Sequence, residues 1–295
     1  MPELDGELWR DIYYASFDDL RLHVRYYPAA EDGARPVVCL PGLTRNARDF
    51  HYLASYLCRH PNRPRPVYCV DYRGRGGSEF DPSWENYTPF IELIDTLDFM
   101  TAQGLHQAAI IGTSRGGIIA MMMAALRPTA MGVVVLNDVG PVMETRGLTR
   151  IMGYVGRTPV PRSWENATIL TREMHGRAFP ALEAWQWEEM ARAMFNESGG
   201  RPAPGYDRKL AHAFGNIDLS RPAADLWPQF IALGQFPALV IRGANSDLLS
   251  EQTVETMVER HPNLRTLTVP DQGHAPLLKE PETVEAIEKF LSAND

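Results

Sequence analysis

Gly112-Thr113-Ser114-Arg115-Gly116 lies between a short apolar run at residues 108–111 and a stretch of good helix formers at residues 117–126. The apolar run predicts a buried strand, and the second stretch predicts a helix that ends before Pro128. Strand, Gly-x-Ser-x-Gly turn and helix together are the context of a nucleophile elbow, where flanking glycines permit a sharp turn. We therefore expect Ser114 to be a catalytic nucleophile. The alternative is a glycine-rich turn with an incidental serine, because the five-residue pattern alone also occurs by chance.

Bulk properties limit the class of protein. A length of 295 residues, 44% of them hydrophobic, suits one large α/β domain with an insertion. The net charge of −8 argues against nucleic acid and anionic membranes as partners. Three cysteines, Cys39, Cys58 and Cys69, are an odd number without metal-binding spacing, and the N-terminus has no apolar signal region. We expect a cytoplasmic protein with no metal and no cofactor.

Apolar and alternating runs predict eight strands. They are residues 11–17, 20–27, 37–41, 67–71, 108–111, 132–136, 238–242 and 264–269. The first two alternate around Asp18-Asp19 and form an antiparallel hairpin, whereas the other six are separated by helical patterns. The predicted fold is α/β, with an eight-stranded, mostly parallel sheet covered by helices on both faces.

The alternation of strands and helices breaks after the sixth strand. Residues 141–230 show helical patterns and no convincing strand, which predicts a helical lid inserted into a core domain of residues 1–140 and 231–295. Its large side chains are candidates for lining an apolar substrate pocket: Trp164, Trp185, Trp187, Met174, Met190, Met194 and Phe195. The alternative is that they pack the lid helices onto the sheet. Arg146, Arg150 and Arg157 are weaker candidates for binding a substrate carboxylate.

A nucleophilic serine needs a base that a third group orients. His274 follows the last predicted strand, so its loop opens at the same edge of the sheet as the elbow, and we assign it as the base. Two aspartates lie between the serine and the histidine at carboxyl ends of strands, Asp247 after the seventh and Asp138 after the sixth. We favour Asp247 as the acid and keep Asp138 as its rival, with hydrogen bonding to nearby backbone as the alternative role of Asp138.

An oxyanion hole needs two preorganised N–H groups. One would be the backbone amide of Arg115, directly after the nucleophile. The other would be the amide of Leu43, in the loop after the third strand, where Gly42 allows the backbone to turn.

These motifs together resemble the α/β-hydrolase superfamily. Pro41-Gly42-Leu43 is similar to the family's oxyanion loop, with proline in place of histidine, and Asp71-Tyr-Arg-Gly-Arg-Gly-Gly-Ser78 is similar to its Asp-x-Arg-Gly-x-Gly-x-Ser loop. The resemblance implies membership of the lid-bearing bacterial group that includes carboxylesterases, enol-lactonases and carbon–carbon bond hydrolases. A serine at position 114 argues against epoxide hydrolases and haloalkane dehalogenases, which carry aspartate there.

The resulting hypothesis is a serine hydrolase that cleaves a small carboxylic ester or lactone through an acyl-enzyme. The alternative is hydrolysis of a carbon–carbon bond in a β-diketone or dienoic ketone, because the same three residues would serve it. A third hypothesis is a non-catalytic small-molecule receptor, against which the full set of motifs argues. The expected partner is a small-molecule substrate; the sequence leaves open whether the chain forms a homodimer.

Overall fold

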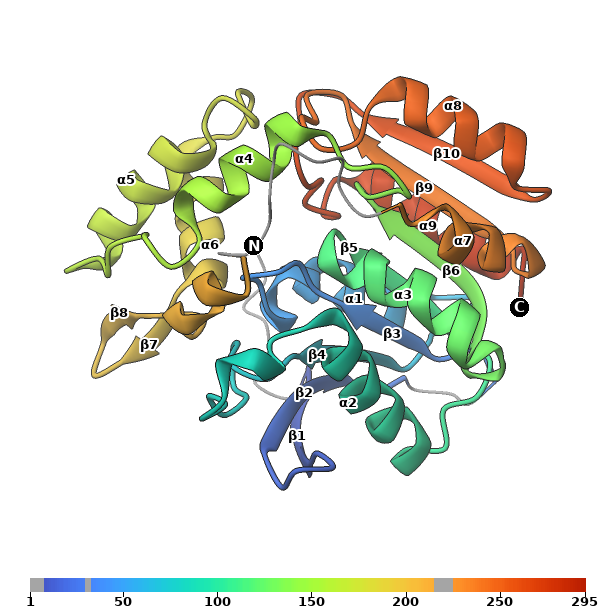
Figure 1. Ribbon diagram of the computed structural model, residues 1–295, viewed down its shortest axis with the longest axis horizontal. Helices are drawn as coiled ribbons and strands as arrows, with labels where there is room; N and C mark the ends of the chain where they lie inside the picture. The colour runs from blue at the N-terminus through green and yellow to red at the C-terminus, as the bar shows by residue number, and fades with distance from the viewer. Residues whose placement is uncertain (1–7, 30–32, 215–224) are drawn as a thin grey trace.

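The computed structural model describes residues 8–29, 33–214 and 225–295. Its main sheet has eight strands in the order β1-β2-β4-β3-β5-β6-β9-β10 (Figure 1). They are β1 (Arg10–Ala15), β2 (Arg21–Tyr27), β3 (Val37–Leu40), β4 (Val67–Asp71), β5 (Ala108–Thr113), β6 (Met131–Asn137), β9 (Ala238–Gly243) and β10 (Leu264–Val269). Strand β2 is antiparallel to both β1 and β4, and the other neighbours are parallel. The predicted eight-stranded sheet with an N-terminal hairpin is confirmed.

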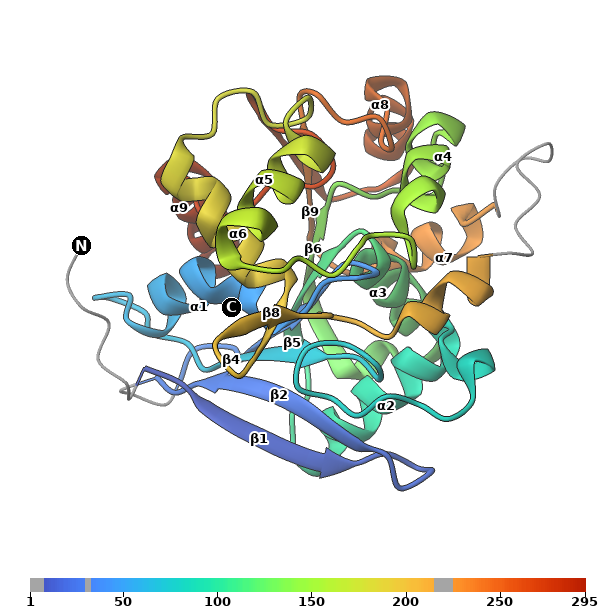
Figure 2. The same ribbon diagram turned by 90° about the vertical axis from the view of Figure 1, so that its left-hand side faces the viewer.

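Helices cover both faces of the sheet because each inner strand is apolar on both sides. Val133 and Val135 of β6 pack in one core cluster, and Val134 and Leu136 pack in the other. Helices α1 (His51–Cys58) and α9 (Pro281–Ser292) cover the first face; α2 (Pro89–Ala102), α3 (Arg115–Leu126), α7 (Trp227–Ala232) and α8 (Glu251–Arg260) cover the second (Figure 2). Short 3₁₀ turns are η1 (Ala47–Phe50), η2 (Trp84–Asn86), η3 (Pro128–Ala130), η4 (Arg208–Phe214) and η5 (Leu233–Gln235). Within the described ranges, no helix has the length and hydrophobicity needed to cross a membrane.

The segment between β6 and β9 contains α4 (Thr145–Tyr154), α5 (Trp164–His175) and α6 (Ala184–Met194), which lie to one side of the core (Figure 1). It also contains a small antiparallel hairpin of β7 (Asn196–Ser198) and β8 (Arg201–Ala203). The expectation of no strand in this segment is therefore wrong. The sequence feature that could have indicated this hairpin is Gly199-Gly200, because such a pair favours a tight two-residue turn. Both glycines have positive φ in the structure (56° and 75°). The limits of a lid at 141–230 remain a prediction.

Candidate active site

The turn between β5 and α3 holds Ser114 in a strained backbone conformation, with φ 50° and ψ −111°. Close packing explains why glycine stands on both sides. A Cβ on Gly112 would lie 2.5 Å from the carbonyl of Gly116, and a Cβ on Gly116 would lie 2.0 Å from the carbonyl oxygen of Leu40. The elbow can therefore form only with glycine at both positions, and it presents Ser114 at the carboxyl edge of the sheet.

His274 lies in the loop after β10, and its Nε2 is 2.9 Å from Oγ of Ser114. Its Nδ1 is 2.8 Å from Oδ2 of Asp138. The Asp138 side chain is fully buried and that of His274 is only 7% exposed, so little water competes for these contacts. The structure thus brings Ser114 and His274 together as the sequence predicts, and it adds a carboxylate in the third position.

That carboxylate belongs to Asp138, whereas we expected Asp247. Asp138 follows β6, the direct neighbour of β5 in the sheet, and its positive φ of 56° is part of the sharp turn there. The carboxylate accepts hydrogen bonds from the Gly243 N–H (2.8 Å) and the Ser246 hydroxyl (2.6 Å) as well as facing His274. Both aspartates come between serine and histidine in the chain, so chain order could not distinguish them.

Asp247 instead forms a bidentate pair with Arg150 of α4, at 2.6 Å from Nε and 2.8 Å from Nη2. Burial raises the pKa of Asp247, but the hydrogen bonds and charge of Arg150 outweigh it and hold the pKa below its usual range. The pair connects the loop after β9 to the inserted segment. The ion pair with Asp247 also uses the hydrogen-bond donors of the Arg150 guanidinium, which we had considered from the sequence as a binding group for a substrate carboxylate.

The loop after β3 lies beside the nucleophile, since a Cβ on Gly42 would be 3.9 Å from Cβ of Ser114. The Arg45 N–H donates to the Gly42 carbonyl oxygen at 3.1 Å. A trans peptide is planar, so fixing that carbonyl also fixes the direction of the Leu43 N–H in the same unit. This geometry is compatible with the predicted role of the Leu43 amide, with the Arg115 amide across from it at the start of α3.

A buried ionic network that sequence reasoning missed ties these two amide-bearing segments together. Glu92 of α2 contacts Arg115 at 2.7 Å and Arg75 at 2.7 Å, and Arg75 Nε donates to the Leu43 carbonyl at 2.9 Å. Burial raises the pKa of Glu92, but the charges of Arg115 and Arg75 outweigh it and lower the pKa. In the sequence, the residue that could have indicated this network is Arg75, which stands in the glycine-rich stretch 71–78.

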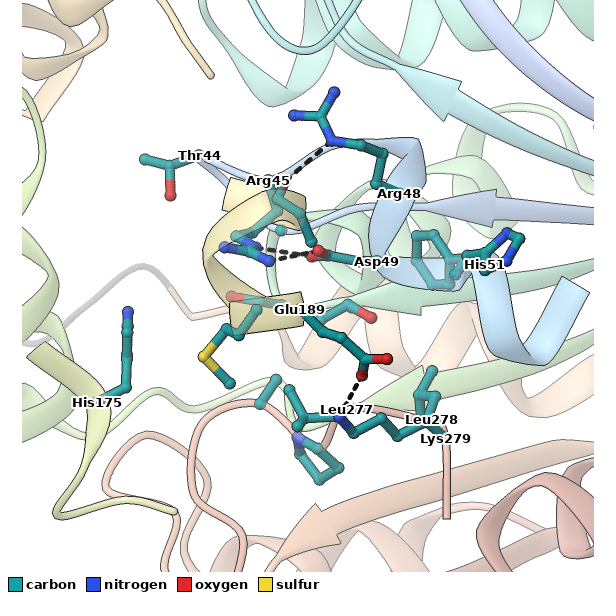
Figure 3. A pocket seen from close by; sticks show the side chains of 18 of the residues that line it. Thr44, Arg45, Arg48, Asp49, His51, His175, Glu189, Leu277, Leu278 and Lys279 are labelled. Atoms are coloured by element: carbon teal, nitrogen blue, oxygen red, sulfur yellow. Dashed lines mark hydrogen bonds and ion pairs between the residues drawn. The ribbon is translucent and has the colours of Figure 1, made fainter. Parts of the chain in front are cut away.

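Ser114 and His274 open into a cavity of about 560 Å³, which is the size of a small-molecule site. Figure 3 shows side chains that line this cavity. Residues from the core and from α4–α6 line it together. Its apolar wall includes Leu43, Phe50, Ile151, Tyr154, Phe179, Met190, Pro276, Leu277 and Leu278. The inserted segment therefore does contribute to the pocket, as predicted.

Of the side chains expected to line the pocket, Met190 does so, whereas Trp164, Trp185, Trp187 and Met194 do not. Trp187 is buried behind the wall against Phe179 and Met190, and Trp164 packs with Met194 in a separate cluster of α5 and α6. Trp185 is half exposed at the surface. None of these four expected residues lines the cavity that contains Ser114. Their packing between helices is the alternative that the sequence left open, and composition alone cannot say which face of a helix meets the cavity.

Titratable groups also line the cavity. His175 at the end of α5 is one of them, and burial lowers its pKa to about 3, with the positive charges of Arg45 and Arg150 acting in the same direction. It is therefore a neutral hydrogen-bonding group near neutral pH. In the part of the chain that the structure describes, no three His, Cys, Asp or Glu side chains are grouped to hold a metal.

Comparisons with known proteins identify the family of the chain. The sequence profile described as "Alpha/beta hydrolase family" matches residues 37–287. A 3-hydroxybutyrate-oligomer hydrolase of Cupriavidus necator is 32% identical over 280 residues, which cover 92% of this chain and 94% of that protein. A 2-(acetamidomethylene)succinate hydrolase of Mesorhizobium japonicum is 27% identical, covering 89% and 90%. The crystal structure of an alpha/beta hydrolase from Novosphingobium aromaticivorans aligns with a TM-score of 0.89 at 40% identity, covering 97% of this chain and 98% of that one.

Proposed function

Because the chain belongs to the alpha/beta hydrolase family, we propose that it is a serine hydrolase of small carboxylic esters or lactones. One observation carries this proposal: the unbroken contact chain from Ser114 Oγ through His274 to Asp138, with distances of 2.9 and 2.8 Å. It opens into a cavity large enough for a small ester. Strained serine, base and buried acid are the parts that acyl transfer requires.

In the proposed reaction, His274 Nε2 takes the proton of Ser114 as Oγ attacks the ester carbonyl carbon. The imidazolium then returns that proton to the alcohol oxygen as the carbon–oxygen bond breaks, which leaves an acyl-enzyme. A water molecule, deprotonated by His274, attacks the acyl carbon, and the proton goes back to Ser114 as the acid leaves. Asp138 accepts from Nδ1–H throughout, holding the imidazole in the useful tautomer and stabilising its charged form.

Negative charge develops on the carbonyl oxygen during both attacks. In our proposal the Leu43 and Arg115 amides stabilise it, and each such donor contributes about 3–4 kcal/mol to the barrier reduction. The Glu92 network supports this role, because it fixes the two segments that carry the amides relative to each other.

The names of the relatives indicate which substrates to test first. One is named for hydrolysis of 3-hydroxybutyrate oligomers, whose units are joined by ester bonds, so such oligomers are suitable test substrates. A second candidate function is cleavage of another bond, such as the carbon–carbon bond of a β-diketone or dienoic ketone. The relative named for 2-(acetamidomethylene)succinate supports this second candidate function. The contact chain from Ser114 through His274 to Asp138 would serve either reaction. Assays with both substrate types separate the two.

The test is the Ser114→Ala variant. We expect turnover of short p-nitrophenyl esters to fall at least about 10³-fold, and labelling by a fluorophosphonate probe to disappear. Ser198→Ala, on the exposed hairpin strand β7, is the matched control and should behave like the parent protein. If Ser114→Ala keeps normal ester turnover, a mechanism through this serine is excluded.

A further inference from the structure

The cavity that begins at Ser114 extends across the sheet to Arg25 on β2. In the sheet order, β4 and β3 lie between β2 and β5, so three interstrand steps separate Arg25 from the elbow. At about 4.8 Å a step this is roughly 14 Å, part of which the arginine side chain itself spans. A substrate can therefore occupy both ends of the cavity at once, with its reacting bond at one end only.

The two carboxylates that line the cavity are already paired. Asp49 binds Arg45, with 2.8 Å between Oδ2 and Nε, and Glu189 lies 3.5 Å from the Lys279 ammonium (Figure 3). Glu189 also accepts a hydrogen bond from the Tyr52 hydroxyl. These pairs cancel most of the charge in the middle of the cavity.

Arg48 at the edge of the cavity is held by neutral groups only. Its Nε donates to the Ala193 carbonyl (3.3 Å), and its Nη2 donates to the Phe195 carbonyl (3.2 Å) and the Asn196 side chain (2.9 Å). No described residue accepts a hydrogen bond from Nη1, which leaves one terminal nitrogen for a ligand. In Figure 3 the Arg48 guanidinium lies on the side of Asp49 away from His175.

Arg25 adds a second positive charge next to the first. Its Nε is buried without a hydrogen-bond partner, and its guanidinium lies 4.5 Å from the centre of the Trp9 ring. Burial lowers the pKa of Arg48; the charges of Asp71 and Asp49 oppose this, and the charge of Arg25 adds to the lowering. Among the described residues neither arginine forms an ion pair with a carboxylate. Two neighbouring cations that no described carboxylate contacts form a site that an anion would stabilise.

We propose, building on the proposed ester hydrolysis, that Arg25 and Arg48 bind a free carboxylate of the substrate while Ser114 attacks an ester carbonyl of the same molecule. The substrate class is then an ester with a carboxylate several bonds from the reacting carbonyl. Linear oligomers of hydroxy acids and monoesters of dicarboxylic acids both fit. The planar guanidinium forks suit a carboxylate, and the cavity of about 560 Å³ suits a molecule of this length.

The experiment compares two substrates that differ only in charge: the linear dimer of 3-hydroxybutyrate and the same dimer with its terminal carboxylate converted to a primary amide. The readout is the ratio of kcat/KM for the acid to kcat/KM for the amide. We expect the parent protein to prefer the acid by at least about 10-fold. Arg25→Gln and Arg48→Gln should each lower that ratio by about 10-fold or more, chiefly through KM for the acid.

Arg265→Gln on the exposed face of edge strand β10 is the matched control, because it removes the same charge far from the cavity and should keep the parent ratio. Arg48→Lys retains the positive charge without the planar guanidinium and should give an intermediate ratio. The thermal unfolding midpoint of Arg48→Gln shows whether that variant folds, and Arg48→Lys replaces it in the comparison if it does not. A parent ratio near one, or arginine variants that slow both substrates equally, overturns the proposal.

Failure of the proposed ester hydrolysis can be distinguished from failure of the proposed carboxylate site. If the parent protein cleaves neither dimer, calorimetry with the uncleaved molecules still tests the site. Binding of the acid at least about 10-fold tighter than the amide, lost in Arg25→Gln, supports the carboxylate site without the esterase. Equal binding of acid and amide overturns it.

Discussion

The variant Asp138→Asn tests whether Asp138, and not Asp247, is the acid that orients His274. The replacement keeps the shape of the side chain and removes its charge. The Gly243 N–H can donate only to an oxygen, so the asparagine carbonyl must occupy that position. Its amide nitrogen then faces Nδ1 of His274, where the carboxylate oxygen now lies at 2.8 Å. The Ser246 hydroxyl loses its acceptor in this variant, because its oxygen already accepts from the Leu248 and Leu249 N–H groups, so we expect a loss of about 1–3 kcal/mol in stability with the fold retained.

The imidazole must then accept at Nδ1 and carry its proton on Nε2, the nitrogen that faces Ser114. In this tautomer it cannot take the serine proton. From the effect of the wrong tautomer in serine proteases we expect kcat to fall by about 10³- to 10⁴-fold, which corresponds to about 4–5.5 kcal/mol. The assay is turnover of a p-nitrophenyl ester at pH 7.5–8, with circular dichroism to establish that the variant folds.

Asp247→Asn is the matched comparison. It breaks the bidentate pair with Arg150 and should lower the free energy of unfolding by about 1–3 kcal/mol, while kcat stays within about 10-fold of the parent value. The reverse outcome, in which Asp247→Asn abolishes turnover and Asp138→Asn retains it, would refute the assignment of the acid from this structure.

Three further predictions address the surroundings of the site. Gly116→Ala would place a methyl 2.0 Å from the Leu40 carbonyl oxygen, so we expect a loss of more than about 3 kcal/mol in a denaturant titration, or no folded protein. Glu92→Gln leaves the buried Arg75 and the partly buried Arg115 without their carboxylate and should cost about 3–5 kcal/mol of unfolding free energy, with a lower kcat in the fraction that folds. His175 has a folded-state pKa of about 3 against 6.5 when unfolded, so the unfolded chain binds its proton first as the pH falls. His175 should therefore lower stability between pH 6.5 and about 3 by up to about 1.4 kcal/mol per pH unit, and urea titrations of His175→Gln should show a smaller pH dependence by that amount.

The fold was predictable because its decisive signals are local. Each inner strand is a short apolar run bounded by turn residues, and strands that alternate with helices leave few topologies open. The elbow was predictable for the same reason: Gly112 and Gly116 stand within two residues of Ser114, and the close packing of the turn on itself and on β3 requires glycine at both. His274 follows a strand directly, so the edge of the sheet it reaches was also known.

The acid was not predictable, because the choice depends on contacts between loops. Asp138 and Asp247 both follow parallel strands that end at the same edge. What distinguishes them is that the Gly243 amide and the Ser246 hydroxyl hold one carboxylate toward His274, while Arg150 holds the other away from it. Arg150 comes from α4, and no spacing rule predicts where the inserted segment meets the core.

The same limit explains why the charged end of the cavity was missed. Arg25 stands in a strand that alternates apolar and polar residues, so the sequence places it on a solvated face. The structure covers that face locally: Trp9 lies over the guanidinium, and the cavity reaches it from the side of η1, which carries Arg48. A charge removed from bulk water in this way needs a partner. Since the carboxylates that line the cavity are already committed to Arg45 and Lys279, the partner that the geometry calls for is one that the substrate brings.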